Sequence, residues 1–311
     1  MTLGQLSAFV MVARLGSVTD AARALGVSEP AVSQALGALR QHHGDKLIVR
    51  TAEGMTLTPG GSRLLPIASQ MIALGADADA AVREANGVAE RLQIAVTSTI
   101  GEFVANPLLA AFSTRSGQAV DASAGLARVA EMPVLVSNRL ADAALGPCLP
   151  GALESTPVFR CTLVAVGSPR DRHRGPPARW RWLVGPSGAD AESDVAQILH
   201  RLGVPDSEIS VFPNQTAAWA AAAGGEGVSI AVEHLVAPQL RRHELAIVPT
   251  PTTPATVCWH LTTLPRDRRS VAAGSLLHFL GTPAAMQVMR SPGSGVPPSR
   301  FRPPVYVTIW S

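Results

Sequence analysis

The stretch Ser17–Leu39, SVTDAARALGVSEPAVSQALGAL, decides the fold of the N-terminal part of this chain. Its pattern predicts two short helices joined by a tight turn. Ser17 is suited to cap the first helix, and Gly26 ends it, because glycine takes the left-handed end conformation without strain. Ser28 is the cap of the second helix. Pro30 falls in its first turn, where backbone amides have no helical partner.

The second helix has two contrasting faces. Val32, Leu36 and Leu39 recur at helical spacing and predict a buried stripe. The opposite face carries small or hydrogen-bonding residues: Glu29, Pro30, Ser33, Gln34 and Gly37. A helix with such a slim polar face can enter a DNA major groove. The alternative is an ordinary helical hairpin on a protein surface, which the spacing by itself does not exclude.

The flanking sequence predicts the rest of a small DNA-binding domain. Residues 3–13 form an apolar-striped helix that can close a core over the pair. Leu47–Arg50 and Met55–Leu57, separated by a turn, predict a two-stranded wing. We expect Arg50 at the wing tip, where a cation can meet a phosphate.

Taken together, these segments resemble the winged helix-turn-helix of LysR-type transcriptional regulators. The residues that carry the resemblance are Gly16–Ala22, Val27–Ser33, Leu39, Leu47, Arg50 and Leu57–Gly60. The resemblance implies a DNA-binding domain over residues 1–58, with double-stranded DNA and RNA polymerase as partners. We expect base contacts from Pro30, Ser33 and Gln34 and phosphate contacts from Ser28 and Arg50. Glutamine can read adenine, and Glu29 can accept a hydrogen bond from cytosine.

Residues 59–90 predict one long helix. Apolar and small residues recur at helical spacing over a length of roughly 45 Å, longer than a small domain can cover. Pro66 should bend this helix or mark its true start. We expect the helix to pair with a second subunit, as the resemblance also implies for the linker helix of LysR-type dimers. The alternative is that it folds back on its own domain.

From residue 91 the pattern changes to alternating strands and helices, which predicts an α/β architecture with a largely parallel sheet. Expected strands cover 92–96, 119–122, 141–145, 162–166, 182–184, 209–212, 228–232, 247–248 and 256–262. Expected helices cover 107–114, 195–202, 216–223, 234–242 and 271–280. The resemblance implies a two-lobed, periplasmic-binding-protein-like effector domain over 91–281. Its first lobe would comprise 91–159 and 270–281, and its second lobe 160–265.

Polar clusters follow several of these strands. Thr97, Ser98 and Thr99 close the first strand, Ser187 follows the strand at 182–184, and Thr216 begins an alanine-rich helix. Hydroxyls and free amides at helix N-termini favour anions. Each cluster can also be a simple helix cap. The resemblance implies that they line one cleft, so we expect a small anionic effector bound by Thr97, Ser98, Thr99, Ser187 and Thr216.

Composition is consistent with a DNA-binding protein that concentrates its affinity on one face. The chain has 311 residues, 47% of them hydrophobic, and a formal net charge of only +3. No signal peptide or membrane span is evident, so we expect a cytoplasmic protein without a membrane partner. The three cysteines, Cys148, Cys161 and Cys258, are far apart and suit a reducing compartment. A redox role for any of them is left open.

No catalytic or cofactor signature is present. The sequence has no GxGxxG, GxxxxGK[ST], GxSxG or HExxH pattern, so we expect neither an enzyme nor a bound cofactor or metal. Residues 282–311 form a Pro/Gly-rich tail that the resemblance does not reach. The sequence therefore predicts a LysR-type regulator that assembles as a dimer or tetramer. The alternatives are a small-molecule-binding protein whose helical head serves protein assembly, and an enzyme that uses the α/β cleft.

Overall fold

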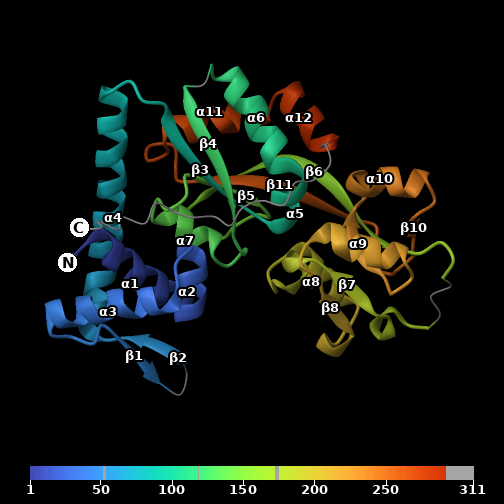
Figure 1. Ribbon diagram of the computed structural model, residues 1–311, viewed down its shortest axis with the longest axis horizontal. Coiled ribbons are helices and arrows are strands. Elements are labelled where there is room, and N and C mark those ends of the chain that lie inside the picture. The colour runs from blue at the N-terminus through green and yellow to red at the C-terminus, as the bar shows by residue number, and fades with distance from the viewer. Residues whose placement is uncertain (52–53, 118, 172–174, 292–311) are drawn as a thin grey trace.

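The computed structural model describes residues 1–51, 54–117, 119–171 and 175–291. Its N-terminal part holds the helices α1 (Leu3–Leu15), α2 (Val18–Leu25) and α3 (Glu29–His43). Hydroxyls of Thr2, Ser17 and Ser28 accept hydrogen bonds from first-turn amides, so each helix starts at a capping side chain. A two-stranded wing follows, with β1 (Ile48–Thr51) antiparallel to β2 (Gly54–Leu57). The predicted winged helix-turn-helix is confirmed (Figure 1).

The helix α4 (Pro59–Ala85) leads from the wing to the second half of the chain. Pro66 lies inside this helix and does not mark its start. One face packs on α1 of the same chain: Ala68 and Ile72 are buried there, and a Cβ at Gly75 would lie 2.6 Å from a methyl carbon of Leu3. The other face is exposed. The helix thus folds back on its own domain along one face, as the alternative expected, and leaves its other face exposed.

One mixed sheet runs through most of the C-terminal half. Its order is β10-β6-β11-β5-β3-β4, with β9 also paired to β6. The strands are β3 (Glu90–Val96), β4 (Val120–Leu126), β5 (Ala143–Gly146), β6 (Glu154–Gly167), β9 (Ser229–Val232), β10 (Ala246–Ile247) and β11 (Ala255–Thr263). Pairs β3–β4 and β3–β5 are parallel, whereas all pairs of β6 and β11 are antiparallel. The prediction of a largely parallel sheet is therefore wrong.

The reason is that β6 and β11 are long strands that run past each other between two lobes (Figure 1). Lobe 1 holds β3, β4, β5 and the helices α6 (Asn106–Arg115), α7 (Met132–Ser137), α11 (Val271–Leu280) and α12 (Pro283–Arg290). Lobe 2 holds β7 (Trp182–Val184), β8 (Ile209–Val211), β9, β10 and the helices α8 (Asp194–Arg201), α9 (Gln215–Ala223) and α10 (Glu233–Arg241). β6 leaves lobe 1 and β11 returns to it, so they must run in opposite directions.

The two long strands change register where they pass between the lobes. Trp259 lies opposite Phe159, but the next residue, His260, lies opposite Pro157, so Val158 is an extra residue in β6. Such a bulge bends a strand and increases its local twist. This point coincides with the lobe boundary expected near residue 160.

Short helical segments connect several strands. α5 (Ser98–Ile100) and a π-helical turn, Gly101–Ala105, lead from β3 into α6. In lobe 2, single 3₁₀ turns cover Pro177–Arg179, Pro186–Ala189 and Asp206–Glu208. The pair β7–β8 is parallel, and Trp182 also bridges to Val228 beside β9. These turns place the residues that follow β3 and β7 at the junction of the two lobes.

The expected Pro/Gly-rich tail starts with a helix instead. α12 is capped by the Thr282 hydroxyl, has Pro283 in its first turn and buries Ala285 and Met289 completely. It packs against α6 and α11, so the sequence prediction for 282–290 is wrong. A capping Thr-Pro pair was the available signal. The remaining tail, 292–311, lies outside the described residues.

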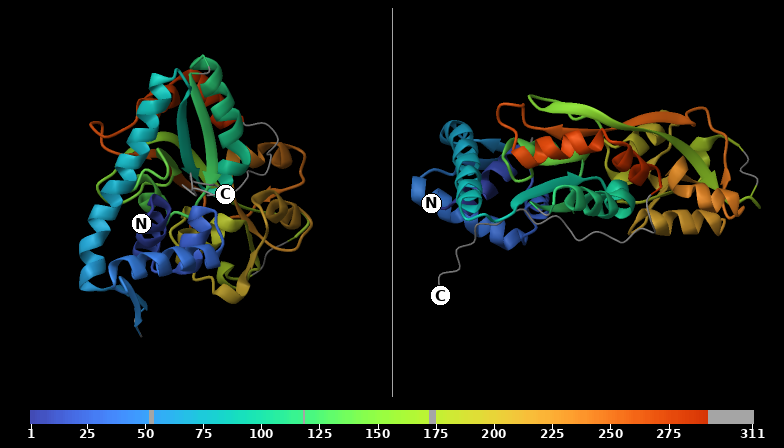
Figure 2. Two further views of the ribbon diagram at one scale, coloured as in Figure 1. Left: turned by 60° about the vertical axis from the view of Figure 1, so that its left-hand side comes forward. Right: turned by 90° about the horizontal axis from the view of Figure 1, so that it is seen from above.

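The molecule is flat when seen from above (Figure 2), and face-on the winged domain lies at lower left, lobe 2 at lower right and most of lobe 1 above them (Figure 1). The core of the winged domain continues into lobe 1. Phe9, Met11 and Leu25 belong to the same buried cluster as Met132 and Leu135 of lobe 1. Among the described helices, none has the length and apolar character needed to cross a bilayer.

Candidate DNA interface and interlobe pocket

The face of α3 that points away from the core is exposed and narrow. Val32, Leu36 and Leu39 are buried, whereas Ser28, Glu29, Pro30, Ser33 and Gln34 are all exposed. The Ser28 hydroxyl accepts a hydrogen bond of 3.4 Å from the amide of Ala31. The helix therefore presents its N-terminal turn and one small polar stripe to solvent. This is the geometry that a helix needs to reach base edges in a major groove.

Arg50 lies in β1, opposite Met55, and its side chain is exposed. Residues 52 and 53, which connect the two strands, lie outside the described residues. Arg50 is therefore within the strand rather than at the expected tip, one residue before β1 ends. In the described structure it makes no ion pair, so its charge is available to a phosphate.

The wing is held against α3 by side chains that the sequence analysis did not select. The Arg40 guanidinium donates hydrogen bonds to the carbonyls of Lys46 (2.9 Å) and Ile48 (3.2 Å). Asp45 accepts from the Leu47 amide (2.7 Å) and the Thr58 hydroxyl (2.8 Å), and these hydrogen bonds hold the pKa of Asp45 below its ordinary value. The contacts of both residues depend on how the segment between α3 and the wing folds back, and the longest of them joins Asp45 to Thr58, 13 residues away.

The start of α4 approaches this wing so closely that only glycine fits. A Cβ at Gly61 would lie 2.0 Å from the carbonyl oxygen of Leu47, and one at Gly60 would lie 2.2 Å from the Asp45 carboxylate. Both distances are shorter than any real van der Waals contact. The pair Gly60-Gly61 therefore sets how α4 leaves the winged domain.

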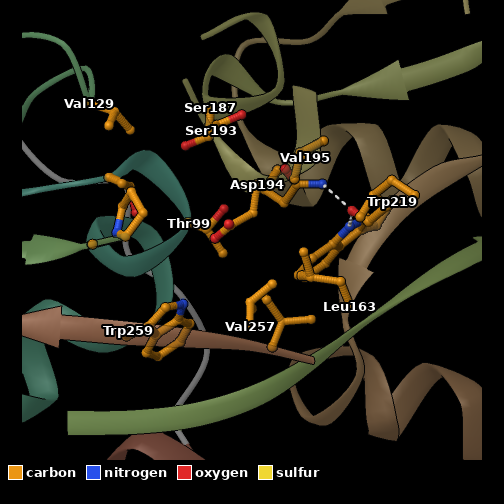
Figure 3. Close-up of a pocket in the computed structure, with 16 residues that line it drawn as sticks. Thr99, Val129, Leu163, Ser187, Ser193, Asp194, Val195, Trp219, Val257 and Trp259 are labelled. Carbon is orange, nitrogen blue, oxygen red and sulfur yellow. Dashed lines mark hydrogen bonds between the residues drawn. The ribbon is translucent and has the colours of Figure 1, made fainter. Parts of the chain in front are cut away.

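A small pocket lies between the two lobes. Its cavity volume is about 50 Å³, far below the several hundred Å³ of a typical small-molecule site. Of the predicted effector residues, Thr97, Thr99 and Ser187 line it. The other residues around it are Val129, Gly146, Pro147, Leu163, Ser193, Asp194, Val195, Gln215, Trp219, Ile230, Val232, Val257 and Trp259. Figure 3 shows hydroxyl and carboxyl groups on one side and apolar side chains on the other.

Several direct contacts hold the lobes together beside this pocket, and two of them involve predicted effector residues. Ser98 of lobe 1 and Ser187 of lobe 2 bond to each other: their hydroxyl oxygens are 2.5 Å apart, and each accepts from the other's amide, at 3.0 and 3.1 Å. In the second contact, the Glu102 carboxylate of lobe 1 accepts from the amides of Gln215 (2.8 Å) and Thr216 (3.0 Å). It also accepts from the Thr216 hydroxyl. The cleft is therefore in a closed state.

Among the described residues that line the pocket, Asp194 is the one that carries a charge. Burial raises the pKa of Asp194 above its ordinary value, and the nearby His260 and Arg201 partly oppose that rise. Its carboxylate forms no hydrogen bond or ion pair within the described structure. Asp194 is also the first residue of α8, where an acidic side chain stabilises the helix dipole.

The cysteines show no sign of a thiol pair in the described structure. Cys148 is exposed, Cys258 is half-buried and Cys161 is buried, and all are free thiols. Burial raises the pKa of Cys161 to about 12, so this thiol stays protonated at neutral pH. Among the described His, Cys, Asp and Glu side chains, no group of three is arranged to hold a metal ion.

Known families match both halves of the chain. Residues 3–62 match the bacterial regulatory helix-turn-helix proteins of the lysR family, and residues 85–284 match the LysR substrate binding domain. The chain belongs to the LysR family of transcriptional regulators. This family comprises DNA-binding regulators rather than enzymes, in agreement with the sequence prediction.

Individual relatives of this LysR-family chain support the assignment. The uncharacterized HTH-type transcriptional regulator Rv0377 of Mycobacterium tuberculosis is 33% identical over 323 aligned positions, covering 100% of both chains. CfxR of Cupriavidus necator is 29% identical, covering 90% of this chain and 91% of its own. The solved structure of a full-length AphB variant has a TM-score of 0.59 at 16% identity, covering 90% of this chain and 98% of its own, and shows the shared fold.

Three expected effector residues of this LysR-family chain, Ser98, Ser187 and Thr216, are bonded to the opposite lobe in the closed state. Ser98 is bonded to Ser187, and neither Ser98 nor Thr216 is among the residues that line the pocket. The reason for Thr216 is Glu102, whose carboxylate takes both its amide and its hydroxyl. Sequence reasoning missed Glu102, Asp194 and the two indoles. The signal that the sequence offered for Glu102 was an acidic residue placed within an apolar helical stretch, next to Phe103.

Proposed function

We propose that this protein binds double-stranded DNA through α3 and the wing and that a small molecule between the lobes modulates this binding. Pro30, Ser33 and Gln34 would contact base edges, with Glu29 able to accept from cytosine, and Ser28 and Arg50 would contact phosphates. The exposure of all six side chains supports this assignment. Recruitment of RNA polymerase and a cytoplasmic location follow from the same role.

We propose dimerisation through the outer face of α4. Its side chains Ile67, Leu74 and Val82 are 53%, 66% and 61% exposed, although they are large and apolar. With Ala78, Ala81 and Ala85 they form a stripe along the helix. Small residues let two helices approach closely, and burial of the large ones supplies the free energy. Two such dimers would form a tetramer that touches neighbouring DNA sites.

One segment, residues 128–131 of lobe 1, supports the coupling between the pocket and the DNA-binding domain. On one side, the Arg128 guanidinium lies 2.6 Å from the carboxylate of Asp20 in α2 and 2.9 Å from Glu131. Arg23 of α2 lies 3.9 Å from the same Glu131, which is buried. The segment is therefore anchored to the helix that precedes the recognition helix.

On its other side, the same segment contacts the pocket and lobe 2. Val129 lines the pocket, and its amide donates a hydrogen bond of 2.6 Å to the carboxylate of Asp190 in lobe 2. Parting of the lobes would break this bond and change the position of the segment that holds α2. Ligand entry would thus alter the orientation of the DNA-binding head, and with it the spacing of heads in an oligomer.

DNase I footprinting on the DNA immediately upstream of the protein's own gene tests this function. We expect protection over several helical turns at physiological salt, with enhanced cleavage in the middle where the DNA bends. A metabolite that occupies the cleft should shorten or shift the footprint. Absence of protection even at low salt would contradict the proposal and favour a head that serves only protein assembly.

A further inference from the structure

The anion site expected at α9 is filled by the protein itself. Glu102, 6% exposed, reaches from lobe 1 to the N-terminus of α9 in lobe 2 and accepts from the amides of Gln215 and Thr216 and from the Thr216 hydroxyl. Free amides and the positive end of the helix dipole are the features that bind an anionic ligand. An external carboxylate or phosphate would have to displace a tethered, buried one. The free amides that favoured an anionic effector are thus already used.

The remaining pocket has the opposite electrostatic character. Asp194 brings a carboxylate that forms no hydrogen bond or ion pair in the described structure. His260 and Arg201 act on it electrostatically from outside the pocket, and no Lys, Arg or His is among the described lining residues. A second anion placed beside this carboxylate would meet repulsion at low dielectric as well as its own desolvation cost. The hydroxyls of Thr97 and Thr99 form no hydrogen bond in the described structure and can accept one. Gln215 is not free, because its side-chain amide donates to the carbonyl of Ile230.

The apolar side of the pocket is built around two indoles. Trp219 and Trp259 line it, together with Leu163, Val195 and Val257 (Figure 3). The Trp219 ring is held in place: its N–H donates to the Ile230 carbonyl at 3.3 Å, and it stacks on Phe103 of lobe 1 with ring centroids 5.0 Å apart. Fixed indole rings next to an acid attract organic cations, since the faces of the rings are electronegative.

We propose that the effector of this cleft is an organic cation, a protonated amine on a flat or aromatic apolar body. The ammonium would lie against Asp194, with the Thr97 and Thr99 hydroxyls as further acceptors, and the apolar body would lie against Trp219 and Trp259. This inference rests on the proposed interlobe site. The cavity of about 50 Å³ is too small for such a ligand, so the cation must part the lobes, which breaks the Ser98–Ser187 and Glu102–Thr216 contacts.

Three probes of similar shape and different charge test the proposal: 2-phenylethylamine, 2-phenylethanol and 3-phenylpropionate. Binding to the full-length protein is measured by titration calorimetry and by the change in tryptophan fluorescence. We expect the amine to bind at least tenfold more tightly than the alcohol, and the carboxylate to bind most weakly. Equal or tighter binding of the carboxylate overturns the proposal, and so does the absence of saturable binding by all three probes.

Three substitutions, one of them a control, locate the charge recognition. Asp194→Asn should weaken amine binding at least tenfold while leaving binding of the alcohol unchanged, because the amide keeps the size of the side chain but loses its charge. Glu192→Gln is the matched control: it removes the same charge from an exposed residue two positions earlier and should change nothing. Glu102→Ala should free the α9 N-terminus and raise the affinity for 3-phenylpropionate. Unchanged amine affinity in Asp194→Asn would contradict the proposal.

DNase I footprinting, combined with these binding measurements, distinguishes a failure of the cationic-effector proposal from a failure of the proposed regulator function. DNA protection that a saturating amine changes supports both. If the protein protects DNA but binds 3-phenylpropionate more tightly than the amine, the proposed regulator function stands and only the proposal of a cationic effector is overturned. Amine binding that requires Asp194, without DNA protection at low salt, supports the cation site and overturns the regulator.

Discussion

The guanidinium of Arg128 lies 2.6 Å from the carboxylate of Asp20, and this ion pair joins lobe 1 of the effector-binding half to α2 of the DNA-binding half. The residue that follows, Val129, donates to Asp190 of lobe 2 and lines the pocket. A stretch of two residues therefore touches the DNA-binding domain, the cleft and both lobes. The first prediction concerns this connection.

Arg128→Ala should release α2 from lobe 1. Because Arg128 is about two-fifths exposed, the pair itself should contribute on the order of 1 kcal/mol or less, but the buried Glu131 loses a partner as well. Hydrogen exchange should become faster in α2, and a ligand that alters the footprint of the natural protein should no longer do so. Arg115→Ala, an exposed arginine at the end of α6, is the control. Unchanged exchange in α2 would show that the contact does not hold the head.

Arg50→Ala and Gln34→Ala should affect DNA binding in different ways. Loss of Arg50 should weaken binding to all sequences alike and reduce the slope of log K against log[salt] by about one unit. Loss of Gln34 should relax the preference at a single base pair, by about 1–3 kcal/mol. Binding selections on a randomised site, repeated at several salt concentrations, measure both effects. If Gln34→Ala leaves the sequence profile unchanged, the proposed orientation of α3 is wrong.

Leu74→Asp should prevent pairing through α4. Leu74 is 66% exposed at the centre of the apolar stripe, where an aspartate in a helix–helix contact would be buried without a partner. Light scattering after size exclusion should show a smaller species, and DNA affinity should fall because one head binds instead of two. Ala80→Asp adds the same charge to an exposed position off the stripe and should leave the assembly intact. A dimer that survives Leu74→Asp would place the subunit contact elsewhere.

Asp142 should make stability depend on pH. Burial, with a smaller contribution from Glu90, raises the pKa of Asp142 from 3.8 to about 6, while the Gln93 amide, 2.8 Å from its carboxylate, and Arg139 oppose the rise. Between these pH values the folded state keeps a proton that the unfolded state has released. Stability therefore falls as pH rises through this window, and the loss, at most about 3 kcal/mol, is complete above pH 6.

Asp142→Asn should remove this dependence and raise the free energy of unfolding at pH 7, because the amide oxygen can still accept from Gln93 without a charge. Urea unfolding at pH 4.5 and pH 7 measures the effect. Asp79→Asn, an exposed change in α4, provides the reference. The assignment would be contradicted if the difference in unfolding free energy between the natural protein and Asp142→Asn were the same at pH 4.5 and at pH 7.

The sequence by itself determined the elements whose causes lie within a few residues. Ser17, Gly26 and Ser28 set the ends of α2 and α3 through local caps, and the apolar spacing set which face of α3 is buried. The exposed polar face of the recognition helix follows directly from that burial. The family itself could be recognised for the same reason, since its motif is one continuous, ordered run of such local signals.

The tertiary structure decided what depends on residues far apart in the chain. Thr216 is a helix-start hydroxyl in the sequence, but it is closed off by Glu102, which lies more than a hundred residues away. The direction of β11 beside β6, the contact of Arg128 with Asp20, and the meeting of Asp194 with Trp219 and Trp259 are of the same kind. Local patterns report which groups are free within one element. Only packing shows which of them another part of the chain then uses, and this is the reason why we propose a cationic ligand where the sequence alone predicted an anionic one.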